Sequence, residues 1–409
     1  YSIEDLAQLI FDLKQINPRA RVCVKLVASS GIGTIAAGVA KAKADVILIS
    51  GHNGGTGASP QTSIKYVGIP WEMGLTEVNQ VLTLNGLRQN VVIRTDGGIK
   101  TGRDVVIAAI MGAEEFGVAT TSLVAMGCIM VRQCHSNTCP VGVCTQDEDL
   151  RARFSGTPEK VVNLFSFIAE EVREILARLG FKSLKDIIGR TDLLYQISRG
   201  STHLDDLDLN SLLIQAEKDP SVEYFNHRDI NDAGSTIDER IIEDAHKFLQ
   251  TGQKIELNYP IKNTDRAVGT KLSSKIYTTF KSRYGSKEWD SNINKDHLNI
   301  NLTGSAGQSL GAFATKGLKI NLFGDANDYV AKGLSGATIS IRPHKDSTLI
   351  SQENTIAGNT VLYGATSGEL YIAGQAGERF AVRNSGAITV VEGCGSVSYT
   401  HLTLPTTRY

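Results

Sequence analysis

The sequence of 409 residues lacks a long apolar run and a substantial net charge. Its apolar stretches, such as VILIS at 46–50, are much shorter than the ~20 residues that a membrane-spanning helix needs. A net charge of −1, without a stripe of lysine or arginine, argues against a nucleic-acid partner. No basic segment followed by an apolar one opens the chain, so we expect a cytoplasmic protein whose cysteines stay reduced.

Cysteine is also scarce, and four of the six cysteines lie close together. Cys128, Cys134, Cys139 and Cys144 follow the spacing C-x5-C-x4-C-x4-C. Disulfides are disfavoured in a reducing compartment, and most zinc sites show more closely spaced cysteine pairs. Clustered thiolates are ligands for soft metals and for iron–sulfur clusters. An iron–sulfur site is therefore favoured, with a zinc site or unliganded thiols as the alternatives.

The overall composition is that of an ordinary globular protein, with 41% hydrophobic and 21% charged residues. A chain of 409 residues predicts two or three domains. The sequence starts with Tyr1 rather than Met, inside what looks like a helix cap, so we expect it to be part of a longer chain.

Helix and strand patterns alternate over the first 122 residues. Apolar strands are predicted at 22–28, 45–50, 91–95 and 114–118. Strands that are apolar throughout indicate a parallel sheet covered by helices. Four consecutive βα units with Gly-rich loops favour the last half of a (β/α)8 barrel over a doubly wound sheet. The first half would then precede residue 1.

Two loops after the last strands are candidate phosphate sites. In (β/α)8 barrels, chemistry lies at the carboxyl ends of the strands, and the last two βα loops often hold phosphate. Glycines allow close backbone approach, and the helix that follows supplies N–H donors. Beside the cysteines, such loops predict a phosphate-bearing redox cofactor next to an iron–sulfur cluster. The loop residues are Asp96, Gly97 and Gly98, then Gly117, Val118, Ala119 and Thr120.

Lys25 is a cation inside an otherwise apolar strand. A buried lysine needs a partner, and a flavin ring that becomes anionic on reduction is one. The alternative is a lysine that reaches out to solvent at the strand end. We take Lys25 as the candidate catalytic and cofactor-contacting residue.

The sequence pattern divides the chain into further segments. Residues 1–205 would form the barrel part with its cysteine loop and a helical extension, and 206–264 would form a polar linker with short helices. From 265 to 396, short β-branched runs recur at roughly twenty residues or less, which favours the stacked coils of a parallel β-helix. Residues 397–409 lose this pattern, and we expect a foreign tail there.

Five stretches together resemble the glutamate synthase family, in particular the large (alpha) subunits of the bacterial NADPH type. They are VKLVASSGIGTIAAGVAKAKADVILISGHNGGTGASP, RTDGGIKTGRDVVIAA, GCIMVRQCHSNTCPVGVCTQD, GSAGQSLGAFATKG and GDANDYVAKGLSG. The resemblance implies an FMN barrel, a [3Fe-4S] cluster and a C-terminal right-handed β-helix. By position, it implies that Cys128, Cys134 and Cys139 are the cluster ligands. The two glycine loops would follow the FMN phosphate and ribityl chain, with Lys25 near the isoalloxazine.

The resemblance also implies an activity, the FMN-dependent reductive amination of 2-oxoglutarate, through 2-iminoglutarate, to L-glutamate. Glutamine-derived ammonia would be the nitrogen source, and electrons would arrive through the cluster from a small NADPH-oxidising subunit or from ferredoxin. The amidotransferase domain and the first half of the barrel are not in the sequence, so we expect these 409 residues alone to be inactive. Another FMN and iron–sulfur barrel oxidoreductase, or a non-catalytic electron-relay or scaffold module, are the alternatives.

Overall fold

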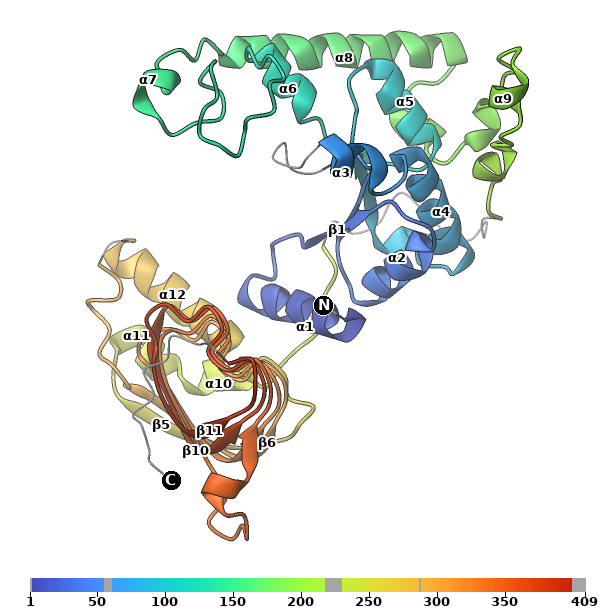
Figure 1. The fold of residues 1–409 in the computed structure, drawn as a ribbon. Helices are drawn as coiled ribbons and strands as arrows, with labels where there is room; N and C mark the ends of the chain where they lie inside the picture. The colour runs from blue at the N-terminus through green and yellow to red at the C-terminus, as the bar shows by residue number, and fades with distance from the viewer. Residues whose placement is uncertain (1, 55–60, 218–229, 287, 399–409) are drawn as a thin grey trace. The chain divides into compact units, whose positions relative to one another are not determined.

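The computed structural model describes residues 2–54, 61–217, 230–286 and 288–398, which fall into two compact units (Figure 1). The first unit comprises residues 1–7 and 21–231, and the second comprises 8–20 and 232–409. Helix α1 (Ile3–Ile16) therefore begins in the first unit and ends in the second. In the described part of the chain, no helix combines the length and hydrophobicity that crossing a membrane requires.

The first unit is built on a parallel sheet whose strands follow one another in chain order. Its strands are β1 (Cys23–Val27), β2 (Val46–Ser50), β3 (Val92–Asp96) and β4 (Glu115–Phe116). This arrangement confirms the predicted parallel sheet. Helices α2 (Ile32–Lys41), α4 (Trp71–Leu84) and α5 (Gly102–Ile110) alternate with the strands. The apolar core between helices and sheet includes Ala36, Val39, Ile47, Ile49, Leu75, Val78 and Ile93.

The sheet is curved toward the face opposite these helices. Arg21, just before β1, forms an ion pair with Glu115 of β4, with 2.8 Å between Nη2 and Oε1. In a flat sheet, β1 and β4 would lie about 14 Å apart, because three interstrand steps separate them. Arg94 of β3 binds the same carboxylate, with 2.9 Å between Nε and Oε2. Side chains from both outer strands therefore meet over a concave face, as they would inside part of a barrel.

The prediction that 22–28 is a buried strand is wrong for the described residues. Cys23, Lys25 and Val27 are exposed, and the Lys25 side chain is 41% accessible. β1 is an edge strand of the sheet, and these alternate side chains project from its concave face. Lys25 is therefore a partly exposed cation rather than a buried one.

The rest of the first unit is helical, as the sequence predicts after residue 123. Helix α8 (Pro158–Leu179) packs against α5 through Ile168, Val172 and Leu176, and ends at Gly180 with a left-handed φ of 81°. The short elements are α3 (Gln61–Tyr66), η1 (Arg88–Asn90), α6 (Thr120–Ala125), α7 (Glu148–Arg151), η2 (Leu184–Ile187), η3 (Thr191–Leu193), α9 (Thr202–Asp205) and η4 (Asn210–Leu213).

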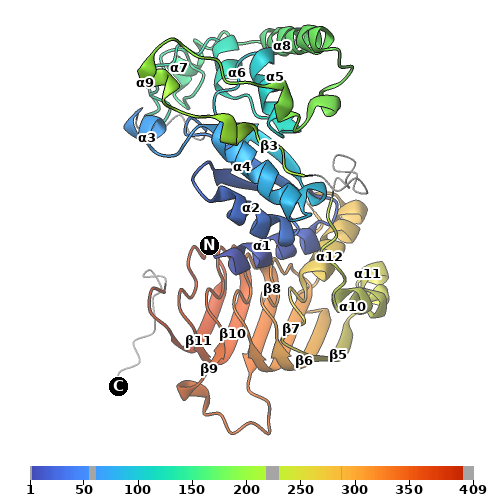
Figure 2. The ribbon, with the colours of Figure 1, turned by 90° about the vertical axis from the view of Figure 1, so that its right-hand side faces the viewer.

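The second unit is built on a larger parallel sheet, in the order β11-β10-β8-β7-β6-β5 (Figure 2). β9 also pairs with β10 and β7. Aliphatic side chains at alternate positions of these strands are buried, which explains the β-branched runs in the sequence. The elements are α10 (Asp238–Asp244), α11 (His246–Thr251), β5 (Ile255–Ile261), α12 (Thr270–Tyr284), β6 (Leu298–Ala306), β7 (Leu318–Ala326), β8 (Ser335–Arg342), η5 (Ser351–Glu353), β9 (Thr355–Ala357), β10 (Ser367–Ala376) and β11 (Ile388–Cys394).

The same turn recurs between the strands of this sheet. Tyr329, Thr360, Arg379 and Val397 all have a left-handed φ of 58–63°. The N–H of each of the first three donates to a carbonyl of the next such turn, for example Tyr329 to Asn359 at 2.9 Å. Stacked turns of this kind hold neighbouring strands in register.

Two predicted boundaries differ from the course of the chain. The predicted linker at 206–264 contains α10, α11 and β5, and β5 pairs with β6 along its full length. The repeated turn continues past residue 396, because Arg379 donates to the carbonyl of Ser396 and Ser398 accepts from the Phe380 N–H. Residues 399–409 of the predicted tail lie outside the described residues.

Asp238 is a buried carboxylate whose ionisation should make stability depend on pH. It accepts the N–H groups of Gly269 and Leu272 near the start of α12, at 2.8 and 3.0 Å. Burial nevertheless raises the pKa of Asp238 to about 6. A raised pKa means that the folded chain binds the proton more tightly than the unfolded chain. The stability gained from this tighter proton binding is complete below 3.8, the pKa of the group in the unfolded chain. It is lost as the pH rises through about 6.

We therefore predict that Asp238→Asn changes how the thermal midpoint responds to pH. The amide keeps an oxygen acceptor but does not ionise, so the midpoint of the natural chain minus that of the variant should fall between about pH 4 and pH 7. Thermal unfolding of both proteins at several pH values in this interval measures the difference. A difference that stays constant or rises with pH would contradict the prediction.

Candidate functional site

A pocket of about 570 Å³ lies at the carboxyl ends of the first unit's strands. Parallel strands end at the same edge of a sheet, so the loops that follow β2, β3 and β4 meet there, beside Lys25 of β1. All eight residues predicted for the cofactor line this pocket: Lys25, Asp96, Gly97, Gly98, Gly117, Val118, Ala119 and Thr120. Sequence reasoning missed Asn53, Gly54, Ile99, Lys100, Thr121, Met130 and Arg132, which complete the lining.

The two adjacent glycines serve different purposes. Both have positive φ, 105° at Gly97 and 119° at Gly98. A Cβ on Gly97 would lie 2.9 Å from the backbone nitrogen of Gly51, so this residue allows two loops to pack. A Cβ on Gly98 would have no atom within 4 Å. Gly98 therefore borders open space, where a bound group can approach the backbone closely.

The expected helix N-terminus at the first loop is already occupied by side chains. Thr101 and Asp104 form a capping box at the start of α5, in which Asp104 also accepts the Lys100 N–H at 3.0 Å. The donors expected for phosphate at this helix are thus partly engaged. Helix α6 differs, because its N-cap is Ala119 and no side chain caps it. Lys25, Lys100 and Arg132 supply positive charge around the pocket.

Ser50 is the polar last residue of β2, and Asp96 is the polar last residue of β3. The Lys25 Nζ lies 3.8 Å from Oδ2 of Asp96, and the Ser50 hydroxyl donates to the other carboxylate oxygen. Ser50 is fully buried, and sequence reasoning did not single it out. In the sequence, Ser50 is distinguished only as the polar last residue of an apolar strand.

The cysteine loop surrounds one sulfur with backbone donors. Burial alone would raise the pKa of the Cys139 thiol, but the N–H groups of residues 141–144 bring that pKa below its ordinary value. The Met130 N–H also approaches the Cys128 sulfur, at 3.4 Å. Asn137, with φ of 61°, ties the loop together by accepting the Gln146 N–H at 2.6 Å. Backbone donors to sulfur stabilise thiolates, which is the form that binds metal.

Among the described residues, no set of three His, Cys, Asp or Glu side chains is arranged around one metal ion. An iron–sulfur cluster makes a different demand, because each thiolate binds a separate iron. Cys144 stays close to the others: its thiol lies 3.5 Å from the Cys134 carbonyl oxygen. Burial and then the neighbouring Cys144 raise the pKa of Cys134. Clustered thiolates are the donor type that fits an iron–sulfur cluster.

The cysteine loop and the glycine loops share one pocket. Met130 and Arg132, which lie between Cys128 and Cys134, line it together with Gly98 and Thr120. The loop that carries the clustered thiols therefore also forms part of the wall around the space that the glycine loops enclose.

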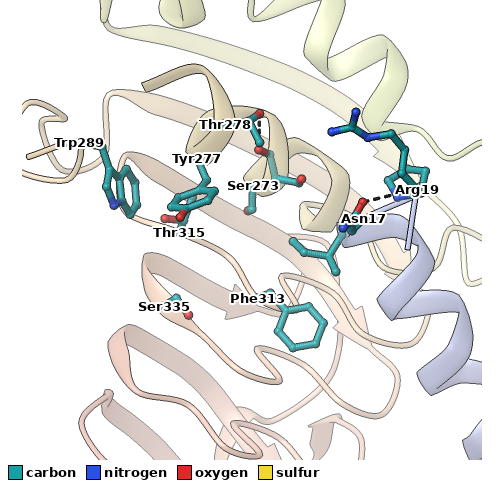
Figure 3. A pocket seen from close by; sticks show the side chains of 12 residues that line it. Asn17, Arg19, Ser273, Tyr277, Thr278, Trp289, Phe313, Thr315 and Ser335 are labelled. Atoms are coloured by element: carbon teal, nitrogen blue, oxygen red, sulfur yellow. Dashed lines mark hydrogen bonds between the residues drawn. The ribbon is translucent and has the colours of Figure 1, made fainter. Parts of the chain in front are cut away.

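A second pocket, of about 580 Å³, lies in the second unit (Figure 3). Tyr277 and Trp289 meet edge to face there, with ring centroids 5.1 Å apart. Its hydroxyls are engaged locally: Ser273 donates to the Gly269 carbonyl and Thr278 to the Ser274 carbonyl. No predicted site residue lines this pocket.

Comparisons with known proteins match the chain in two parts. A family model described as the conserved region in glutamate synthase matches residues 1–182, and one described as the GXGXG motif matches 238–403. The chain is 64% identical over 403 residues to the glutamate synthase [NADPH] large chain of Azospirillum brasilense. It is 53% identical to ferredoxin-dependent glutamate synthase 2 of Synechocystis, and 52% identical to the [NADPH] large chain of Bacillus subtilis.

These alignments cover 97–98% of the chain but only 25–26% of each relative, so the chain spans about a quarter of their length. Among solved structures, a flavocytochrome b2 variant with sulfite bound matches at 15% identity. That match covers 48% of this chain and 42% of the other, with a TM-score of 0.30. A likeness this slight supports no conclusion about function.

Proposed function

Because the chain belongs to the glutamate synthase family, we propose that it forms the flavin and iron–sulfur part of a glutamate synthase. The reaction is the reductive amination of 2-oxoglutarate, through 2-iminoglutarate, to L-glutamate, with ammonia derived from glutamine. The relative with 64% identity is an NADPH-type large chain, which favours a small NADPH-oxidising subunit over ferredoxin as the electron source.

The observation that supports this proposal most directly is the shared pocket. The residues proposed to hold FMN are Lys25, Asp96, Gly97, Gly98, Gly117, Val118, Ala119 and Thr120, and all of them line it. FMN, when bound, accepts electrons singly and returns them as a pair, which links a one-electron cluster to imine reduction. Gly98 would let the backbone approach the bound group, and the cations around the pocket would balance the phosphate.

Cys128, Cys134 and Cys139 are proposed to hold a [3Fe-4S] cluster. The N–H groups that surround the Cys139 sulfur would stabilise its thiolate form. Met130 and Arg132 connect this loop to the flavin pocket, so electrons would pass between the two groups over a short path.

Each of the two units has a proposed fold that agrees with this function. The curved parallel sheet would be the last half of a (β/α)8 barrel, as the ion pairs across its concave face suggest. The stacked parallel strands of the second unit would be a right-handed parallel β-helix. Its role would be that of a rigid spacer.

The flavin assignment predicts the effect of a single glycine substitution. In the complete enzyme, Gly98→Val should lose most of its FMN while keeping its iron, because the new side chain would fill the space beside the backbone. Gly86→Val is the matched control. Gly86 also has a positive φ, of 62°, and an equally open Cβ position, but it lies outside the pocket.

Flavin content, measured by absorbance after protein denaturation, and iron content decide the outcome. Both variants place a β-branched side chain at a positive φ, and unchanged iron content shows that the enzyme remains folded, so loss of FMN alone in Gly98→Val supports the assignment. Full flavin content in a folded Gly98→Val enzyme would refute it.

The cluster assignment predicts that the four cysteines are not equivalent. Cys134→Ala should abolish the cluster, whereas Cys144→Ala should keep it. Electron paramagnetic resonance of the oxidised enzyme is the measurement, because an oxidised [3Fe-4S] cluster is paramagnetic and an oxidised [4Fe-4S]2+ cluster is silent. A silent spectrum with about four irons per chain, or loss of the cluster in Cys144→Ala, would show that four cysteines rather than three bind the cluster.

A further inference from the structure

We propose that Ser50 and Asp96 set the strength of the positive charge that Lys25 presents to the flavin. In this arrangement, Ser50 holds the Asp96 carboxylate away from the ammonium group, so that the lysine is only partly neutralised. The inference rests on the proposed function, because it assigns Lys25 to a bound flavin. Ser50 acts through Asp96 and is therefore a positioning residue.

The sheet register brings these side chains together. Val27, Ser50 and Asp96 are paired across β1, β2 and β3, so Ser50 and Asp96 project side by side from the same face. The buried Ser50 hydroxyl donates to Oδ1 of Asp96. Lys25, two residues before Val27, approaches the other oxygen, Oδ2. Each carboxylate oxygen thus has its own partner.

The distances make the two partners unequal. Ser50 is within hydrogen-bond distance of Asp96, whereas the Lys25 Nζ is 3.8 Å from Oδ2, beyond the ~2.7–2.9 Å of a charge-assisted hydrogen bond. The ammonium and the carboxylate therefore attract each other without direct contact. Without the Ser50 hydrogen bond, a rotation of the carboxylate would let the exposed Lys25 ammonium close this gap of roughly 1 Å.

Two glycines limit the position of the carboxylate. A Cβ on Gly54 would lie 2.6 Å from Oδ1 of Asp96 and 2.8 Å from the Ser50 Cβ. A Cβ on Gly117 would lie 2.8 Å from the Asp96 Cβ. Asp96 is thus packed closely between two backbone segments that have no side chain to give way. This packing restricts its orientation, and the Ser50 hydroxyl selects the one in which Lys25 stays at a distance.

The consequence for a flavin is electrostatic. Lys25 lines the pocket with 41% of its side chain accessible, and the negative charge of Asp96 reduces its field there. A tighter ion pair would reduce that field further, and removal of the carboxylate charge would increase it. Substitution of Ser50 and of Asp96 should therefore change the stability of an anionic flavin in opposite directions.

Sulfite binding to the FMN of the complete enzyme reports this field. Sulfite adds its electron pair to N5 of the oxidised flavin, forming an N–S bond and leaving negative charge near N1 and O2, with no other reactant needed. We expect Ser50→Ala to raise the dissociation constant of sulfite and Asp96→Asn to lower it, each by roughly two- to fivefold, as for one partly exposed charge contact. Ser50→Thr keeps the hydroxyl, so its dissociation constant for sulfite should equal that of the natural enzyme.

A second measurement does not need the flavin. Acetic anhydride acetylates uncharged lysine amines, and mass spectrometry gives the rate at Lys25 in enzyme freed of FMN. A closer carboxylate stabilises the ammonium form, so Ser50→Ala should slow acetylation at Lys25 and Asp96→Asn should accelerate it. The acetylation rate can be measured even if a variant binds FMN poorly.

The outcomes separate the two proposals. A natural enzyme that binds no FMN refutes the proposed function, whereas the acetylation rates still test the Ser50–Asp96–Lys25 arrangement. Changes of the same sign in Ser50→Ala and Asp96→Asn, or no change in either, overturn the inference even when FMN is bound. Opposite signs, with recovery in Ser50→Thr, support it, because general loosening of the structure would move both variants in one direction.

Discussion

Parallel strand pairing requires the chain to return to the same end of the sheet before each new strand begins, and both units are built around this constraint. In the first unit the return path is a helix, so the loops after β2, β3 and β4 meet at one edge and line one pocket. In the second unit the return path includes a repeated left-handed turn, and the turns stack on one another as the strands do. The same pairing rule thus brings loops together around a pocket in one unit and stacks regular turns in the other.

Charge on the concave face of the first sheet follows from its curvature. Glu115 accepts both Arg21 and Arg94, and Lys25 lies near Asp96, so each carboxylate is shared between strands. These pairs are partly exposed, and pairs of this kind contribute little stability individually. The importance of the Lys25–Asp96 pair lies in its position, because it leaves a partly neutralised cation facing the pocket. In the proposed flavin site, this balance would determine how strongly the protein favours the anionic form.

The cysteine loop shows how local backbone geometry can favour the thiolate form that the proposed iron–sulfur cluster needs. Positive φ at Met130, Arg132, Asn137 and Gly142 bends the loop repeatedly, and the N–H groups of residues 141–144 turn toward the Cys139 sulfur. Met130 and Arg132 then continue into the wall of the neighbouring pocket. Two groups that exchange electrons need to be close, and a single loop would contribute to both of the proposed sites.

The sequence by itself determined the parallel strands, the glycine loops and the cysteine spacing, because these depend on local patterns: continuous apolar runs, residues that tolerate positive φ, and thiols at short intervals. The tertiary structure decided which of these features meet. The exposure of Lys25 depends on its strand lying at a sheet edge, and β5 is a strand because β6 pairs with it inside a segment that is polar in sequence. Ser50 became relevant only when the register placed it beside Asp96, 46 residues further along the chain. Contacts between strands depend on register and curvature, and neither is encoded within a short stretch of sequence.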